Sequence, residues 1–162
     1  MHNLILPLTL DFWLKVGLTF LCGGVIGLER QLRGKAAGIR TSILICMGTQ
    51  TFVSLSVVIN SGTTGYDPSR VLGQVVTGIG FIGAGVIMGK GGEVKGVTSA
   101  AIIWMLAAIG SAIGFGYLTM AATLTLMTVG VLIGVEMLEE TYIRLRRGDH
   151  KPSREEVESD EE

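Results

Sequence analysis

A group of charged residues directly follows the first long apolar segment of the chain. Glu29 ends that segment, where a carboxylate is costly unless a cation neutralises it. Arg30 and Arg40 flank the next loop closely enough to pair with Glu29, and arginine can do so through two parallel hydrogen bonds. The loop also contains Arg33, Gly34, Lys35 and Gly38, and Thr41 follows it. We predict a polar interface here, and the two glycines would permit a tight reversal of the loop. The alternative is that these cations only fix the topology of the protein in the membrane.

A second charged loop could belong to the same interface. It contains Lys90, Glu93 and Lys95, with Thr98 and Ser99 at the start of the next apolar segment. The free N–H groups of a helix start attract anions, so an acidic partner could dock there; ordinary turn and capping chemistry is the alternative. Glu136, near the end of the last apolar segment, either faces this basic side as part of an ion-pair cluster or is simply solvated.

The residues that usually carry catalysis or bind metals are scarce. The two histidines, His2 and His150, lie outside the apolar segments, and the two cysteines, Cys22 and Cys46, lie inside them without the spacing of a metal site or a disulfide framework. We therefore predict no enzyme activity, no catalytic, cofactor-binding or metal site, and no nucleic-acid partner.

Glycine motifs invite a nucleotide-binding interpretation that their context excludes. Gly78, Gly80 and Gly83 match the pattern G-x-G-x-x-G, which needs a preceding strand and a solvated helix start to meet pyrophosphate. Here the pattern lies inside an apolar run. Gly89 and Lys90 resemble the end of a P-loop, but Gly91 stands where Ser or Thr would hold magnesium.

Helix packing explains these glycines better. Small residues four positions apart let membrane helices approach closely, and a seam left uncovered would favour a dimer. The glycines predicted to pack helices are Gly23, Gly27, Gly78, Gly80, Gly83, Gly85, Gly89, Gly110, Gly114, Gly130 and Gly134.

Apolar runs of membrane-spanning length must position these residues. They predict an all-α protein, a compact bundle of five transmembrane helices near 11–28, 41–59, 71–88, 97–113 and 118–138. Lys and Arg are retained in the cytoplasm, so the basic loops predict an outside N-terminus and a cytoplasmic C-terminus. Residues 1–145 form the membrane domain, and we expect residues 1–10 to stay in the mature chain. The charged tail, 146–162, has too few apolar residues to fold and is predicted to be disordered.

The interior of the predicted bundle is almost free of charge. Asp11 and Lys15 are four apart in the first span, where they could form an ion pair, but snorkelling of Lys15 to the outer headgroups is the favoured interpretation. The middles of the second, third and fourth spans contain no Asp, Glu, Lys, Arg or His. A dedicated magnesium pathway would usually place carboxylates there, so the sequence supports one poorly.

Three segments together, residues 27–42, 78–87 and 94–104, resemble the MgtC/SapB family of bacterial inner-membrane proteins. The resemblance covers about residues 11–138. It implies a role in adaptation to low magnesium and, in pathogens, in virulence through survival inside macrophages. An inhibitory contact with the F-type ATP synthase is implied for some members. Longer members add a soluble C-terminal domain, and we expect this chain to be a short form, so functions tied to that domain are not carried over.

These observations lead to two functional hypotheses. The first is a multi-pass protein of the bacterial inner membrane that binds another membrane complex, such as an ATP synthase or a transporter; its glycine seams predict a homo-oligomer, with a dimer favoured. The second is a small ion channel or carrier for magnesium or another cation, lined by backbone carbonyls and by the hydroxyls of Thr119, Thr123 and Thr128. Those hydroxyls could instead bond within their own helix.

Overall fold

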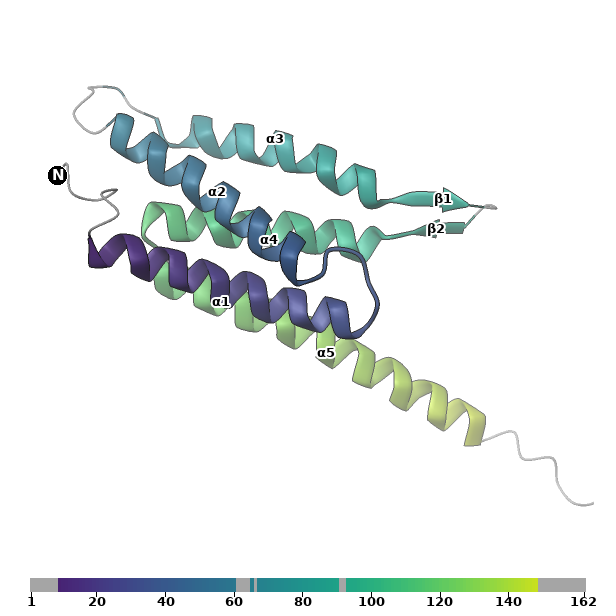
Figure 1. Ribbon diagram of the computed structural model, residues 1–162. Coiled ribbons are helices and arrows are strands. Elements are labelled where there is room, and N and C mark those ends of the chain that lie inside the picture. Colours follow the sequence, from purple (N-terminus) through teal and green to yellow (C-terminus); the bar gives the residue numbers. More distant parts are fainter. Residues whose placement is uncertain (1–8, 61–64, 66, 91–92, 149–162) are drawn as a thin grey trace, which may run out of the picture. The chain divides into compact units, whose positions relative to one another are not determined.

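The computed structural model describes residues 9–60, 65, 67–90 and 93–148, without the side chains of 88–90, 93 and 139–148. Five helices and one small hairpin make up these residues (Figure 1). In chain order they are α1 (Leu10–Leu32), α2 (Ile39–Ile59), α3 (Ser69–Val86), β1 (Met88–Lys90), β2 (Glu93–Lys95), α4 (Val97–Phe115) and α5 (Leu118–Gly148). The chain divides into two compact units, Met1–Val129 and Gly130–Glu162.

All five helices are long and apolar enough to cross a membrane, in α5 over Leu118–Leu138. Their bounds lie within about four residues of the predicted spans, the precision that apolar run lengths allow. The exterior is also apolar: Phe81 is 83% exposed and Leu126 is 75% exposed. Such surface is unfavourable in water and favourable in a bilayer, so the protein is a multi-pass membrane protein.

The sequence did not predict the hairpin between α3 and α4. Strands β1 and β2 pair antiparallel, with Gly89 opposite Val94. Gly96 then starts α4 in the left-handed conformation, with φ 91°. Any Cβ at Gly96 would overlap the Val86 carbonyl oxygen, so only glycine lets the end of the hairpin pass the end of α3.

The division between α4 and α5 rests on Gly116, which has a φ of 90°. Its N–H donates to the Ile113 carbonyl at 2.9 Å, and the N–H of Tyr117 donates to the Ala112 carbonyl at 2.8 Å. This pair of bonds is the Schellman motif, in which a left-handed glycine satisfies the last carbonyls of a helix. It lies where the sequence predicted the reversal between the last two spans.

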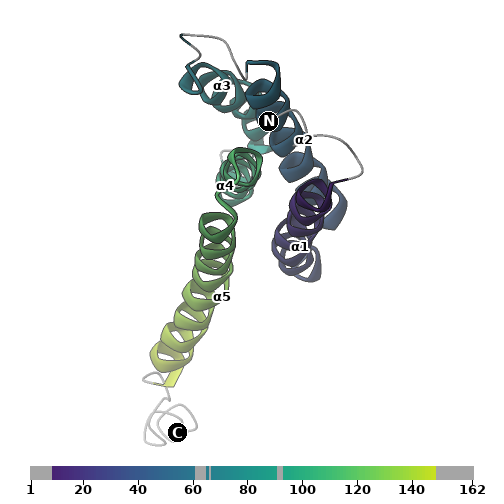
Figure 2. The same ribbon diagram turned by 90° about the vertical axis from the view of Figure 1, so that its left-hand side faces the viewer.

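Helix α2 packs against both α1 and α4 (Figure 2). A Cβ on Gly27 of α1 would lie 2.6 Å from the Cα of Ile39, and one on Gly23 would lie 2.9 Å from the Cα of Ile43. Further along α2, a Cβ on Gly114 of α4 would lie 2.7 Å from the Cβ of Val53. These helices are therefore closer together than any larger residue would allow.

The other predicted packing glycines have different surroundings. A Cβ on Gly83 would make an ordinary contact with Ala100 at 3.8 Å. Within the described part of the chain, nothing lies within 4 Å of such an atom on Gly78, Gly80, Gly85, Gly130 or Gly134. The tight contacts thus belong to α1 and α4, the two helices that pack most closely against α2.

Helix α5 ends slightly beyond the predicted start of the charged tail. The helix continues to Gly148, whereas the tail was predicted to begin at residue 146. Residues 149–162 of that tail lie outside the described residues.

Candidate functional site

Glu29 and its cations form a polar cluster in the last turns of α1. The Nε of Arg33 lies 2.5 Å from Glu29 Oε1, and the Nη1 of Arg30 lies 3.9 Å from Glu29 Oε2. The side chains of Glu29 and Arg30 are only 9% and 5% exposed. The carboxylate is therefore neutralised mainly by Arg33, one helical turn away, in a position largely screened from solvent.

Arg30 ties this cluster to another helix. Its Nη2 donates a 3.0 Å hydrogen bond to the Ser99 hydroxyl, in the first turn of α4 and 69 residues further along the chain. Both residues are buried. We call Glu29, Arg30, Arg33 and Ser99 the Glu29 cluster.

The Glu29 cluster keeps unused hydrogen-bonding capacity. Among the described residues, the Nε of Arg30 and both carboxylate oxygens of Glu29 are buried without a hydrogen-bond partner. The two carboxylate oxygens do form ion pairs, Oε1 with Arg33 Nε and Oε2 with Arg30 Nη1. Buried polar atoms are nearly always satisfied in folded proteins, so unpaired ones mark a place where a partner group or solvent can bind.

The α1–α2 loop reverses the chain next to this cluster. Gly34 and Ala37 both have a φ of 62°, whereas Gly38 has an ordinary φ of −66°. Of the two glycines predicted to permit the reversal, Gly34 takes the left-handed conformation and Gly38 does not. Ala37 takes it as well, although this conformation is unfavourable for a residue with a Cβ. The loop is held by Gln31, whose Oε1 accepts the Ile39 N–H at 3.3 Å in place of a capping side chain.

Contrary to the prediction, Arg40 does not pair with Glu29. It lies exposed on the first turn of α2, and the described residues form no ion pair within 4.0 Å between these two side chains. The reason is the direction of the turn, which buries Ser42 and leaves Arg40 and Thr41 outside. Lys35 is exposed as well. Arg33 takes the role that the sequence gave to Arg40.

The remaining predicted site residues are not brought into the Glu29 cluster by any described contact. Lys95 is exposed on β2, and the side chains of Lys90 and Glu93 lie outside the described residues. Glu136 belongs to the second unit, which is described by itself. No group of three or more His, Cys, Asp or Glu side chains that could hold a metal ion occurs in the described part of the chain.

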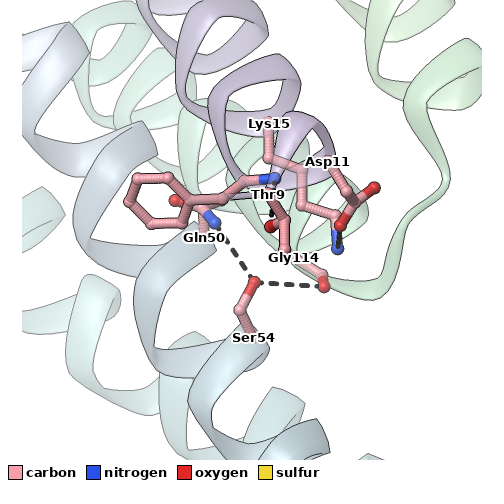
Figure 3. A network of polar contacts seen from close by, with 7 residues as sticks. Thr9, Asp11, Lys15, Gln50, Ser54 and Gly114 are labelled. Carbon is pink, nitrogen blue, oxygen red and sulfur yellow. Dashed lines mark hydrogen bonds and ion pairs between the residues drawn. The ribbon is translucent and has the colours of Figure 1, made fainter. Parts of the chain in front are cut away.

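A second polar site surrounds Lys15, near the other end of α1 (Figure 3). Its Nζ lies 3.1 Å from Asp11 Oδ2, and its side chain is 10% exposed. The favoured prediction, snorkelling to the headgroups, is therefore wrong: Lys15 points into the bundle and pairs with Asp11. It borders a cavity of about 140 Å³ with Gln50 and Ser54.

Gln50 and Ser54 extend this site into α4. Gln50 Nε2 donates to the Ser54 hydroxyl at 3.1 Å, and that hydroxyl donates to the Gly114 carbonyl at 3.2 Å (Figure 3). Sequence reasoning missed both residues. The available signal was an amide in the middle of an apolar span, a position where polar groups are rare and need partners.

We expect Asp11→Asn to destabilise the protein, because it leaves the buried ammonium of Lys15 without its counter-ion. Asp11 is itself 42% exposed, so we expect a loss of only about 1–2 kcal/mol, less than for a fully buried pair. Unfolding in mixed micelles would measure the loss. Asp67→Asn is the matched control, since Asp67 is exposed. An equal effect of the two substitutions would contradict a stabilising role for the Lys15 pair.

Two of the three threonines considered for an ion path, Thr123 and Thr128, use their hydroxyls within their own helix. Thr123 Oγ1 donates to the Thr119 carbonyl at 2.9 Å, and Thr128 Oγ1 donates to the Leu124 carbonyl at 2.7 Å. Their hydroxyl hydrogens are thus engaged in the way that apolar helices commonly use threonine.

Comparison with known proteins places these features in a family. The model of the MgtC family matches residues 16–141. A protein of Escherichia coli (strain K12) named "Putative magnesium transporter YhiD" is 44% identical over 143 residues, which are 85% of this chain and 65% of that protein. "Protein MgtC" of Brucella abortus (strain 2308) is 39% identical over 136 residues, 83% of this chain and 56% of the relative.

A third relative, "Protein MgtC" of Salmonella typhimurium (strain 14028s / SGSC 2262), is 39% identical over 129 residues, covering 78% of this chain and 54% of that protein. The chain thus spans between about half and two thirds of the length of these relatives. No solved structure matches it.

Proposed function

Because this chain belongs to the MgtC family, we propose that it is a magnesium-related protein of the bacterial inner membrane that acts by binding and regulating another membrane complex. Regulation would come from binding rather than from catalysis. In pathogens the same role would serve intracellular survival. The F-type ATP synthase is the first partner to test, because the family resemblance implies it, and a transporter is the second.

The Glu29 cluster is the observation that carries this proposal. Glu29 and Arg30 are buried at one end of α1, yet they keep unsatisfied polar atoms. The positive-inside rule assigns this end, with Arg33, Lys35 and Arg40, to the cytoplasm. A partner that presents a hydrogen-bond donor to Glu29 and an acceptor to Arg30 would satisfy both groups. These hydrogen bonds would contribute more binding free energy than an ion pair exposed to solvent.

A homodimer is part of the proposal. Gly85, Gly130 and Gly134 have open space around them within the described residues of one chain, and small residues allow two membrane helices to approach closely. Cross-linking in native membranes would test for the dimer. A protein that stays monomeric at all expression levels would contradict this part of the proposal.

Ion conduction is the second candidate, favoured by the name of the Escherichia coli relative. Two observations count against it. The middles of α2, α3 and α4 contain no Asp, Glu, Lys, Arg or His. The hydroxyls of Thr123 and Thr128 are bonded within α5.

Glu29→Gln separates the two functions. It removes the charge with little change of shape, and Arg40→Gln is the matched control because Arg40 is exposed. We expect growth under magnesium limitation to fall to the level of the deletion strain with Glu29→Gln and to stay normal with Arg40→Gln. Co-purification of the partner complex should fall about tenfold, the effect of losing one charged hydrogen bond.

Flux measurements complete this test. Purified protein in liposomes should carry no magnesium or proton current above that of empty liposomes. Flux that Glu29→Gln abolishes would overturn the binding proposal in favour of conduction. Normal growth with a folded, membrane-inserted Glu29→Gln protein would contradict the role of the Glu29 cluster.

A further inference from the structure

A groove of about 870 Å³ separates α2 from α3. These helices contact each other much less than either contacts α4. The apolar walls of the groove include Phe52 and Ile59 of α2, which are 66% and 74% exposed, and Ile82 of α3, which is 45% exposed. Its volume lies in the upper part of the range of about 300–1,000 Å³ that is usual for ligand sites.

One end of the groove is polar and cationic. Arg70 and Gln74 lie one turn apart on α3, and Asn60 ends α2 beside them in the groove wall. Among the described residues, the guanidinium of Arg70 forms no ion pair within 4.0 Å. It interacts electrostatically with Asp67, and both residues are exposed. This end therefore offers a forked cation to an anionic group.

The groove has the length of one membrane leaflet. On α2 it runs from Asn60 to Thr49, and on α3 from Arg70 to Ile82. At about 1.5 Å per residue these stretches measure roughly 16–18 Å. Half of a hydrocarbon core of about 30 Å is about 15 Å. An acyl chain whose headgroup lies at Arg70 would thus end near the bilayer midplane, where the groove ends.

We propose that this groove holds a phospholipid from the leaflet on the side of the α2–α3 connection. One acyl chain lies along Phe52, Ile59 and Ile82, and the phosphate accepts hydrogen bonds from Arg70, supported by Asn60 and Gln74. The charged end, the apolar walls and the leaflet length together fit this occupant. The proposal does not depend on the function proposed above.

Gly78→Leu tests whether the acyl chain occupies the groove. Gly78 lines the groove and has open space beside it, so leucine would fill the place of the chain without disturbing the helix contacts. Gly80→Leu is the matched control, because Gly80 is on the same helix, has equally open space and does not line the groove. Native mass spectrometry of the purified full chain, titrated with dioleoylphosphatidylglycerol, would measure the one-to-one complex.

We expect Gly78→Leu to weaken lipid binding about tenfold or more and Gly80→Leu to leave it unchanged. Equal binding by the two variants would overturn the proposal. A dimer in place of the lipid complex, lost only in Gly78→Leu, would also overturn it, because a second copy of the chain would then fill the groove.

Arg70→Gln tests the phosphate contact. We expect about tenfold weaker binding of dioleoylphosphatidylglycerol, with only part of the affinity restored in Arg70→Lys, which keeps the charge and loses the fork. Dioleoylglycerol has the same chains without a phosphate, so it should bind wild-type protein and Arg70→Gln equally. An equal loss for both lipids would show that Arg70 acts on the groove itself and would contradict the assignment of the phosphate.

Discussion

Replacing Gly110 by leucine is expected to separate α4 from α2 and to give the largest loss of stability of any single substitution in the first unit. A Cβ at Gly110 would overlap Thr49 Oγ1 and the Cys46 carbonyl oxygen of α2. Cys46 contributes a backbone atom, which cannot move aside as the end of a side chain can. Overpacking usually costs about 1–3 kcal/mol, and we expect a loss of about 3 kcal/mol or more here.

The measurement is the free energy of unfolding in mixed micelles, together with the fraction of monodisperse protein after purification. Gly48→Leu is the matched control, since Gly48 lies on α2 and, among the described residues, no atom lies within 4 Å of the position that a Cβ would take there. A leucine tolerated equally well at both positions would show that α2 and α4 can separate without loss.

Arg30→Ala is expected to give the second large effect. It removes the hydrogen bond to Ser99 and one of the two cations near Glu29. The side chains of Arg30 and Ser99 are both buried. Removing one partner of a buried ion pair costs about 3–5 kcal/mol of stability. Because Glu29 keeps its ion pair with Arg33, we expect a loss at the lower end, about 3 kcal/mol.

A double-mutant cycle separates the bond to Ser99 from the neutralisation of Glu29. Ser99→Ala should cost about 1.5–3 kcal/mol, and in the Arg30→Ala background it should cost little more. Arg40→Ala, which truncates an exposed arginine, should change stability by less than about 0.5 kcal/mol. Additive effects of Arg30→Ala and Ser99→Ala would show that the observed bond does not join α1 to α4 energetically.

The sequence was sufficient for the helices because membrane spans depend on run length and composition, which are local properties. It also placed the reversal between the last two spans, within residues 114–117, where Gly116 follows the end of α4. The hairpin of β1 and β2 was missed because each strand has only three residues, too few for an alternation of polar and apolar residues to indicate pairing. Membership of the family was predictable from three motifs and is confirmed.

For the polar sites, the sequence identified single residues better than it identified the contacts between them. Glu29 was identified because an acid at the end of an apolar segment needs a cation. Its true partner, Arg33, is one helical turn away, whereas Arg40 depended on a loop direction that Ala37 changes by its positive φ. The bond from Arg30 to Ser99 spans 69 residues, and no local pattern indicates it.

The close packing of α2 against glycines of α1 and α4 limits which amino-acid substitutions α2 can accept. At its tightest contacts, α1 and α4 already present the smallest residue available, at Gly27 and Gly110. An enlargement of Ser42 or Cys46 on α2 therefore has no compensating reduction across the interface. A second-site suppressor of such a change would have to move a whole helix. At these contacts, α2 therefore cannot change by the paired large-to-small substitutions that other protein cores tolerate.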